Sequence, residues 1–226
     1  MSDAFDQAEP VEGRRQPFVR GWRLLAIAAL LAFVALVVIR TFIVDLYYIP
    51  SDSMQPALEP GDRILVNPTG HTSDIERGDI VVFDGTGSFN KYVPGNAFLR
   101  NPLKEAGQWA GLAGSDTVYV KRVIGVAGDT VACCDANGKL IVNGVPQDEP
   151  YIFGTDVAST DRFTVTVPEG RIWVMGDHRS VSIDSRALIG APGGGFIKTE
   201  KIIGEPTRII WPLDRAGRIE SQANTQ

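Results

Sequence analysis

The sequence predicts a mainly β protein with antiparallel sheets, preceded by one N-terminal transmembrane helix. Residues 24–39 form an unbroken, almost wholly apolar run. After it come short segments rich in β-branched residues, separated by Gly, Pro and Asp, in a chain with 24 Gly and 14 Pro. No helical pattern recurs between these segments, which disfavours a parallel sheet with crossover helices.

The composition narrows the class of protein. The chain has 226 residues, of which 44% are hydrophobic and 22% charged, so disorder of the whole chain is not expected. A formal net charge of −5 argues against a basic nucleic-acid binder. With two Cys and two His, a four-ligand Cys/His zinc site would need all of them, and the adjacent Cys133 and Cys134 lack ligand spacing. No metal is therefore expected.

The apolar run has the length of a membrane span. A helix over residues 24–44 rises about 31 Å, against a hydrocarbon core of roughly 30 Å. No hydrophilic face interrupts the run, which argues against the alternative of a buried core helix. Arg14, Arg15, Arg20 and Arg23 precede it. The positive-inside rule thus predicts a cytoplasmic tail over residues 1–21, a transmembrane helix over 22–44 and an extracytoplasmic remainder.

The remainder is interpreted as one domain with an insertion. We assign the main domain to residues 45–130 and 171–214, a small β insertion to 131–170, and a flexible tail to 215–226. Asn137-Gly138 predicts a hairpin turn, Asn143-Gly144 a second turn, and Pro206 a bulge in the last strand. Residues 85–116 are expected to form a long loop with one short helix near 102–112. Strands are expected at residues 46–49, 63–67, 80–84, 117–126, 130–134, 140–142, 162–167, 171–175 and 201–211.

A serine-containing turn is the first candidate for chemistry. Pro50 and Pro56 restrict the backbone on both sides of Ser51 and Ser53. A serine held on a rigid turn can present its hydroxyl to a cleft as a nucleophile. The alternative is a linker that leaves the membrane and contains turn-forming serines.

A lysine within a strand is the candidate base. Lys121 lies in the apolar segment 117–126, and burial there would lower the pKa of its amine, so that it could accept a serine proton. The alternative is that Lys121 and Arg122 point to solvent on opposite faces. His71 and His178 both sit in turns and are expected to be solvated.

A polar turn over residues 176–186 is the third candidate. It contains two possible ion pairs, Asp184 with Arg186 and Asp177 with Arg179. The alternative is an ordinary salt-bridged surface loop.

Together these segments resemble the type I signal peptidase (leader peptidase) family, the bacterial Ser–Lys serine proteases. The matching motifs are Ser-Met-x-Pro at 53–56, Tyr-Val-Lys-Arg-Val-Ile-Gly at 119–125, and the Gly-Asp-x-Arg and Ser-x-Asp-Ser-Arg runs within 176–186. The resemblance covers residues 24–211 in outline. It implies a membrane-bound hydrolase that needs no cofactor and that removes signal peptides from exported preproteins.

The resemblance also implies roles for individual residues. Ser53 would be the nucleophile and Lys121 the general base, with the Ser51 hydroxyl and the Ser53 N–H forming the oxyanion hole. Ser182 would hydrogen-bond the Lys121 amine. Structural support is expected from Asp177, Arg179, Asp184 and Arg186.

The same family cleaves after small residues at the −3 and −1 positions, the Ala-x-Ala pattern. Its substrates emerge from the secretion translocon, and the lipid bilayer is a further expected partner. Shallow apolar pockets would be lined by Tyr47, Ile49, Pro50, Met54, Leu58, Ile64, Val82, Tyr119 and Val120.

Two other hypotheses remain beside this one. A catalytically silent, membrane-anchored peptide-binding β-domain would not need Ser53, Lys121 and Ser182 together. A self-cleaving Ser–Lys repressor would need a DNA-binding helical domain.

The sequence departs from many family members at Asp52, where they have Gly, and at His178, where they have Asn. Cys133 and Cys134 are expected to have no catalytic role, and a strained vicinal disulfide, free thiols and an intermolecular bridge all remain open.

Overall fold

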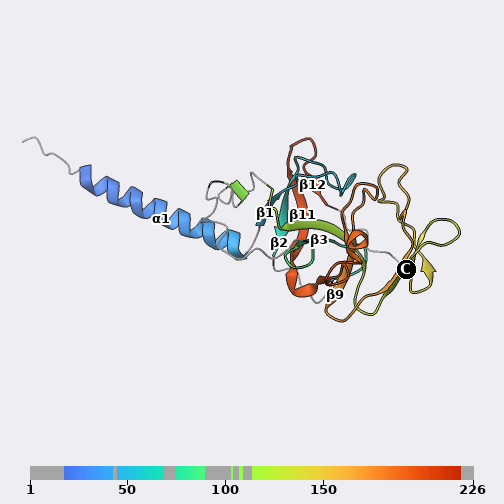
Figure 1. The fold of residues 1–226 in the computed structure, drawn as a ribbon. Coiled ribbons are helices and arrows are strands. Elements are labelled where there is room, and N and C mark those ends of the chain that lie inside the picture. Colours follow the sequence, from blue (N-terminus) through green and yellow to red (C-terminus); the bar gives the residue numbers. More distant parts are fainter. Residues whose placement is uncertain are drawn as a thin grey trace, which may run out of the picture. The chain divides into compact units, whose positions relative to one another are not determined.

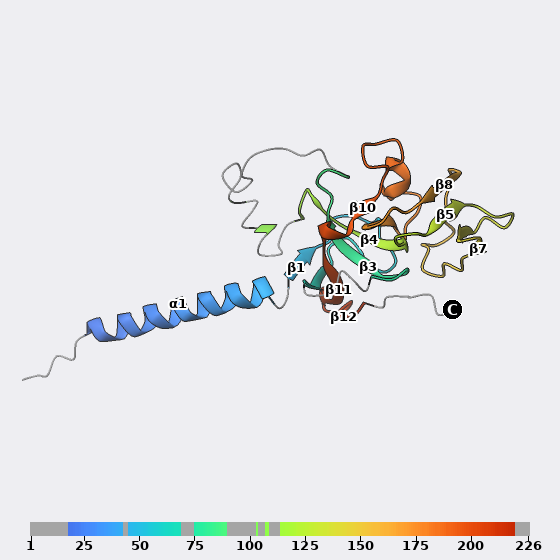
Figure 2. The same ribbon diagram turned by 90° about the horizontal axis from the view of Figure 1, so that it is seen from below.

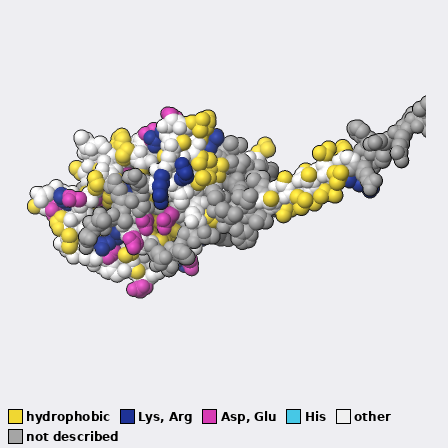
Figure 3. Space-filling view, turned by 180° about the vertical axis from the view of Figure 1, so that it is seen from behind, with side chains coloured by type: hydrophobic (Ala, Val, Ile, Leu, Met, Phe, Trp, Pro, Cys, Tyr) yellow, Lys and Arg dark blue, Asp and Glu magenta, His cyan; other side chains and the backbone are white. Residues whose placement is uncertain are grey.

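The computed structural model describes residues 18–42, 45–68, 75–89, 103, 107–108 and 114–219. The chain divides into two compact units, residues 1–40 and 41–226. Helix α1 (Phe18–Phe42) carries large hydrophobic side chains that are exposed over its described part, including Trp22, Leu25 and Leu31 (Figure 3). Within the described ranges, no helix meets the combined length and apolarity needed to cross a membrane.

An antiparallel sheet forms the body of the second unit (Figure 1). Its strand order is β1-β2-β11-β3-β4-β9-β10, and β12 pairs with β11. The mainly β, antiparallel fold class expected from the sequence is therefore confirmed. The strands of this sheet are β1 (Asp45–Tyr48), β2 (Arg63–Asn67), β3 (Ile80–Asp84), β4 (Val118–Gly125), β9 (Arg171–Met175), β10 (Ile197–Lys198), β11 (Ile202–Trp211) and β12 (Gly217–Arg218).

The centre of this sheet is the most deeply buried part of the domain. Strand β3 is buried from Ile80 to Phe83, and its partner β4 places Val81 opposite Lys121 and Val82 opposite Val120. Two hydrophobic clusters pack against opposite faces of these strands, one around Val82 and one around Val81. Because neighbouring strand residues point to opposite faces, Lys121 and Arg122 project to different sides of β4.

A smaller sheet has the order β7-β6-β5-β8 and contains β5 (Thr130–Cys133), β6 (Leu140–Val142), β7 (Val145–Pro146) and β8 (Phe163–Thr166). It lies at the end of the domain away from β1 (Figure 2). Asn143 and Gly144 have φ angles of 52° and 83°, the left-handed backbone that a tight hairpin turn between β6 and β7 requires. The hydrophobic core of the smaller sheet contains Val131, Leu140 and Trp173, and Trp173 belongs to β9 of the larger sheet.

The bulge expected at Pro206 is confirmed, because the register of β11 against β2 shifts just after this residue. Other features of the structure were not predicted from the sequence. The short strands β7, β10 and β12 and the 3₁₀ helices Ser185–Leu188 and Thr199–Lys201 were not predicted. Arg215, placed in the tail by the sequence, is instead held by ion pairs to Glu59 and Asp62. Most of the helix expected near 102–112, and His71, lie outside the described residues.

Candidate active site

The two ends of the segment that carries Ser53 are hydrogen-bonded to each other. Ile49 N–H donates to Asp62 O at 2.9 Å, and Gly61 N–H donates to Ile49 O at 2.9 Å. Met54 and Leu58 anchor the turn in the hydrophobic core, where both are fully buried. The Ser53 side chain is therefore held on a rigid turn, and the residue is 8% exposed.

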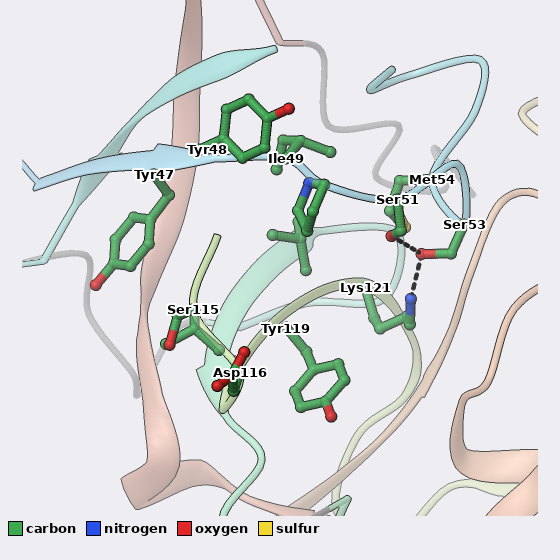
Figure 4. A pocket seen from close by; sticks show the side chains of 13 residues that line it. Tyr47, Tyr48, Ile49, Ser51, Ser53, Met54, Ser115, Asp116, Tyr119 and Lys121 are labelled. Atoms are coloured by element: carbon green, nitrogen blue, oxygen red, sulfur yellow. Dashed lines mark hydrogen bonds between the residues drawn. The ribbon is translucent and has the colours of Figure 1, made fainter. Parts of the chain in front are cut away.

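Strand β4 brings Lys121 against this turn. Lys121 Nζ donates a hydrogen bond to Ser53 Oγ at 2.5 Å, although the two residues are 68 positions apart in sequence. Ser51 Oγ lies 3.3 Å from Ser53 Oγ. Figure 4 shows all three side chains converging at one end of a pocket. The serine-containing turn and strand β4 thus meet as a Ser–Lys pair.

The lysine is buried, with 3% of its surface exposed, rather than solvent-facing. Burial lowers the pKa of Lys121 from 10.5 to about 8, because a charged amine loses its hydration. The nearby carboxylates of Asp184 and Asp177 oppose this shift, and Arg186 adds to it. A substantial fraction of the amine is therefore neutral and able to accept a proton at mildly alkaline pH.

Arg122 occupies the other face of β4 and is also buried. Its guanidinium forms two hydrogen bonds to Asp177, at 2.8 and 2.6 Å, and a third to Gly78 O at 2.7 Å. The Tyr151 ring lies 4.1 Å from the guanidinium carbon. The expectation that Asp177 could pair with Arg179 is wrong, because Asp177 is instead the bidentate partner of Arg122 and Arg179 forms its ion pair with Glu149.

Arg179 instead pairs with Glu149, which belongs to the segment following β7. The Arg179 Nη2 to Glu149 Oε1 distance is 2.5 Å, and both side chains are almost fully buried. Arg179 also donates to Gly176 O and Ala158 O. The sequence did not single out Glu149, since a contact across thirty residues has no local signal.

The expected Asp184–Arg186 pair is present in the structure. Arg186 donates to both oxygens of Asp184, at 2.9 and 2.8 Å, and Gly176 N–H donates to Asp184 at 3.0 Å. Burial alone would raise the pKa of Asp184, but these hydrogen bonds outweigh it and lower the pKa below its usual value. Asp184 is thus a buried, ionised carboxylate, and its hydrogen bonds join Gly176 to Arg186, the two ends of the polar turn.

Ser182 lies beside the nucleophile segment. A β-carbon on Gly176 would collide with both Ser182 Oγ and the carbonyl oxygen of Ser53, so these two atoms border the same small space. Ser182 Oγ is buried without a hydrogen-bond partner of acceptable geometry among the described residues. Its proximity to Asp184 nevertheless contributes to lowering the pKa of that carboxyl. The expected bond from Ser182 to Lys121 is not among the hydrogen bonds of this structure.

A cavity of about 210 Å³ extends from Ser53 and Lys121. Four of its lining residues, Tyr48, Ser115, Asp116 and Val118, were not predicted. Figure 4 shows Tyr47, Ser115 and Asp116 at the end away from the Ser–Lys pair. Six of the expected pocket residues line this cavity: Tyr47, Ile49, Pro50, Met54, Tyr119 and Val120.

The other three expected pocket residues are buried in the core and are not among the residues that line the cavity. Leu58, Ile64 and Val82 have no exposed surface and belong to one core cluster. Ile64 is the cross-strand partner of Tyr47, and Val82 that of Val120. They therefore support the side chains that face the cavity.

The cysteines form a disulfide with each other, across a cis peptide bond with the Cα atoms 3.0 Å apart. Of the three states that the sequence left open, the structure therefore has the vicinal disulfide. Both residues pack in or against the core of the smaller sheet, around Val131 and Trp173.

Known proteins resemble this chain over most of its length. The family described as signal peptidase, peptidase S26, matches residues 22–211. A probable signal peptidase I of Mycobacterium leprae (strain TN) is 34% identical, over 97% of this chain and 86% of that protein. A signal peptidase IB of Staphylococcus aureus (strain COL) is 33% identical, over 88% of this chain and 95% of that protein. The crystal structure of a signal peptidase I from Enterococcus faecalis V583 is 28% identical, with a TM-score of 0.38, and covers 58% of this chain and 96% of that chain. Because the family match and the curated relatives span most of the sequence, the chain belongs to the signal peptidase family, peptidase S26, and is a serine-type hydrolase.

Proposed function

We propose that this protein removes signal peptides with Ser53 as the nucleophile and Lys121 as the general base. The observation that carries the proposal is the 2.5 Å contact between Lys121 Nζ and Ser53 Oγ, made by a buried lysine with a lowered pKa. A serine hydroxyl is a weak nucleophile without such a base. Family membership supports the overall reaction, and this contact supports its mechanism.

In the first half of the reaction, neutral Lys121 takes the proton of the Ser53 hydroxyl. Ser53 Oγ then attacks the carbonyl carbon of the −1 residue, and the carbonyl π electrons move to the oxygen. The Ser53 N–H and the Ser51 hydroxyl stabilise this oxyanion. Collapse of the intermediate breaks the C–N bond, and the Lys121 ammonium donates its proton to the leaving amine of the mature protein.

In the second half, water replaces the amine. Lys121, neutral again, removes a proton from water, which attacks the acyl carbon bound to Ser53 Oγ. Breaking this ester returns the proton to Ser53 and releases the signal peptide with a new carboxylate. The same base therefore serves both halves of the reaction.

The polar turn supports this pair. Ser182, whose buried hydroxyl has no hydrogen-bond partner of acceptable geometry in the described part of the chain, would orient the Lys121 amine when substrate is bound. The ion pairs of Asp177 and Arg179 join this turn to β4 and to Glu149, and Asp184 with Arg186 closes it. These four residues position the site without touching the reacting atoms.

The cavity wall selects small side chains at −3 and −1. Ile49, Met54 and Val120 line the cavity together with Ser53, and we expect this apolar wall to accept Ala and to exclude larger side chains. The same surface keeps water away from Lys121. Specificity for Ala-x-Ala and the lowered pKa of the base thus share one origin.

The membrane anchor over residues 22–44 holds the site where exported preproteins leave the translocon. The run at 24–39 and the preceding arginines support this orientation, with the catalytic domain outside the cytoplasm. Asp45 and Ser53 are eight residues apart, at most about 28 Å of chain. The nucleophile therefore works close to the outer surface of the plasma membrane.

The test uses the full-length protein in detergent micelles and a preprotein with Ala at −3 and −1. We expect wild type to produce one new N-terminus, identified by mass spectrometry, and Ser53→Ala to produce none. A substrate with Phe at −1 should resist cleavage. Cleavage by Ser53→Ala at the wild-type rate would refute the assignment of the nucleophile.

A further inference from the structure

His178 is in direct contact with the nucleophile turn. Its backbone N–H donates to Ser53 O at 3.2 Å, and its ring Nδ1 lies 3.3 Å from Asp52 O. Its side chain is 14% exposed, so the solvated turn histidine expected from the sequence is wrong. One residue thus holds two successive carbonyl groups of the turn that carries Ser53.

Two further side chains lie close to the imidazole ring. The Phe153 ring lies against the imidazole, with centroids 4.3 Å apart. Nε2 lies 4.0 Å from Asp156, whose carboxylate also accepts a hydrogen bond from Ser180 N–H. These contacts favour the orientation of the imidazole in which Nδ1 lies toward Asp52.

The contact with Asp52 O matters because of the peptide group to which this oxygen belongs. The carbonyl of Asp52 and the N–H of Ser53 are the two ends of a single planar amide. Asp52 O also accepts from Gln55 N–H at 3.0 Å, so two donors hold it. Because the N–H of a trans peptide points opposite to its C=O, fixing Asp52 O also aims the Ser53 N–H. A donor on the carbonyl further polarises the amide and strengthens the N–H as a donor.

We propose that His178 is a positioning residue for the oxyanion hole, which orients the Asp52–Ser53 peptide through an Nδ1–H···O=C hydrogen bond. A carbonyl oxygen only accepts, so Nδ1 carries the proton. The bond forms with the neutral Nδ1–H tautomer and with the protonated ring. The inference rests on the proposed function, because it needs the Ser53 N–H to bind the oxyanion.

Two substitutions separate donation from packing. His178→Asn keeps a donor, because its amide nitrogen can occupy the place of Nδ1, but it loses the ring that packs on Phe153. His178→Leu keeps apolar bulk against Phe153 but has no donor. Asp156→Asn is the matched control on the opposite side of the ring, since its amide oxygen can still accept from Ser180 N–H.

The experiment measures kcat and KM of the full-length variants on the Ala-x-Ala preprotein, with the pH profile of kcat/KM and the melting temperature. Loss of a whole oxyanion donor typically costs about 10²–10³ in kcat. For His178→Leu we expect kcat to fall about tenfold or more, toward that limit, at unchanged KM. We expect His178→Asn and Asp156→Asn to stay within about threefold of wild type. The midpoint of the pH profile should stay the same in all of them, because Lys121 is untouched.

The outcomes are decisive in both directions. Retained kcat in His178→Leu, or a larger loss in His178→Asn than in His178→Leu, would overturn the proposal, because packing would then be the role of the ring. A shifted pH midpoint would place the effect on Lys121 and would also overturn the proposal.

Ser53→Ala in the same assay separates a failure of the proposed function from a failure of the role of His178. If Ser53→Ala cleaves normally, the proposed function fails, and the oxyanion role falls with it. If Ser53→Ala is inactive and His178→Leu is normal, only the role of His178 fails.

Discussion

Arg122 and Asp177 form a two-point ion pair, 1% and 0% exposed, on the face of β4 opposite to Lys121. The base and this ion pair come from adjacent residues of one strand, so the strand cannot shift without disturbing both. Asp177 belongs to the polar turn, and the hydrogen bonds of Arg122 therefore join the turn to the strand that carries the base. This link explains how residues far from the reacting atoms can control the geometry of the Ser–Lys pair.

Breaking this pair from one side should destabilise the protein strongly. Removing one partner of a buried pair leaves an uncompensated charge and costs about 3–5 kcal/mol. We expect this loss for Arg122→Met, measured as the free energy of unfolding by chemical denaturation of the detergent-solubilised chain. The double variant Arg122→Met/Asp177→Leu should lose less, since no charge is left alone. A single variant as stable as wild type would contradict the account.

Activity should depend on pH through Lys121. The base must be neutral, and the pKa of the amine is lowered by burial to about 8. We therefore expect kcat/KM to rise about tenfold per pH unit below pH 8 and to level off above it. A profile measured with the Ala-x-Ala preprotein tests this. A midpoint near the ordinary lysine value of 10.5 would mean that the amine is solvated in solution.

The same lowered pKa predicts that the base destabilises the fold. Between pH 8 and 10.5 the unfolded chain binds more protons at Lys121 than the folded chain, so stability rises with pH across this window. Lys121→Met removes the cost of burying the charge and should be more stable than wild type at pH 7 by roughly 3 kcal/mol. The difference should shrink as pH approaches 10.5. Denaturation at several pH values measures it, and a less stable variant at pH 7 would contradict the sign.

Gly176 should tolerate no side chain. A β-carbon there would collide with the Ser182 hydroxyl and with the backbone carbonyl of Ser53. We expect Gly176→Ala to lower kcat by at least about tenfold, since displaced oxyanion and dyad groups carry most of the rate. Gly190→Ala is the control, because a β-carbon at Gly190 meets open space. Equal kcat values for the two variants would show that the nucleophile turn can move aside.

Ser51 should contribute separately from Ser53. Its hydroxyl lies 3.3 Å from Ser53 Oγ and is the side-chain donor of the proposed oxyanion hole. We expect Ser51→Ala to lower kcat about 10²–10³-fold with little change in KM. Steady-state kinetics on the same preprotein measure both constants. A change confined to KM would move Ser51 from stabilising the transition state to binding substrate.

Local sequence signals predicted most of the larger strands. Strands β2 and β3 were expected with the bounds that the structure has, because β-branched runs there end at turn residues. The two-residue strands β10 and β12 have no such signal, since pairing with β9 and β11 alone defines them.

The site was harder to predict than the strands because it depends on contacts across the chain. Ser53 and Lys121 stand out through local motifs, but the partner of Arg179 could not be inferred. Glu149 lies between β7 and β8 of the smaller sheet, and only the tertiary fold brings it against Arg179. Similarly, the sequence pattern identifies Val82 and Val120 as apolar, but only the tertiary packing around the sheet leaves Val120 lining the cavity and Val82 fully buried.

The most direct test of the account is a double-mutant cycle on Ser53 and Lys121. Single-turnover cleavage of the Ala-x-Ala preprotein is measured for wild type, Ser53→Ala, Lys121→Met and the double variant at about pH 8.5. If the two residues act as one unit, each single variant loses about 10³-fold or more, and the double variant is no slower than the slower single variant. A Lys121→Met enzyme that keeps its rate to within about tenfold of wild type would contradict the Ser–Lys mechanism.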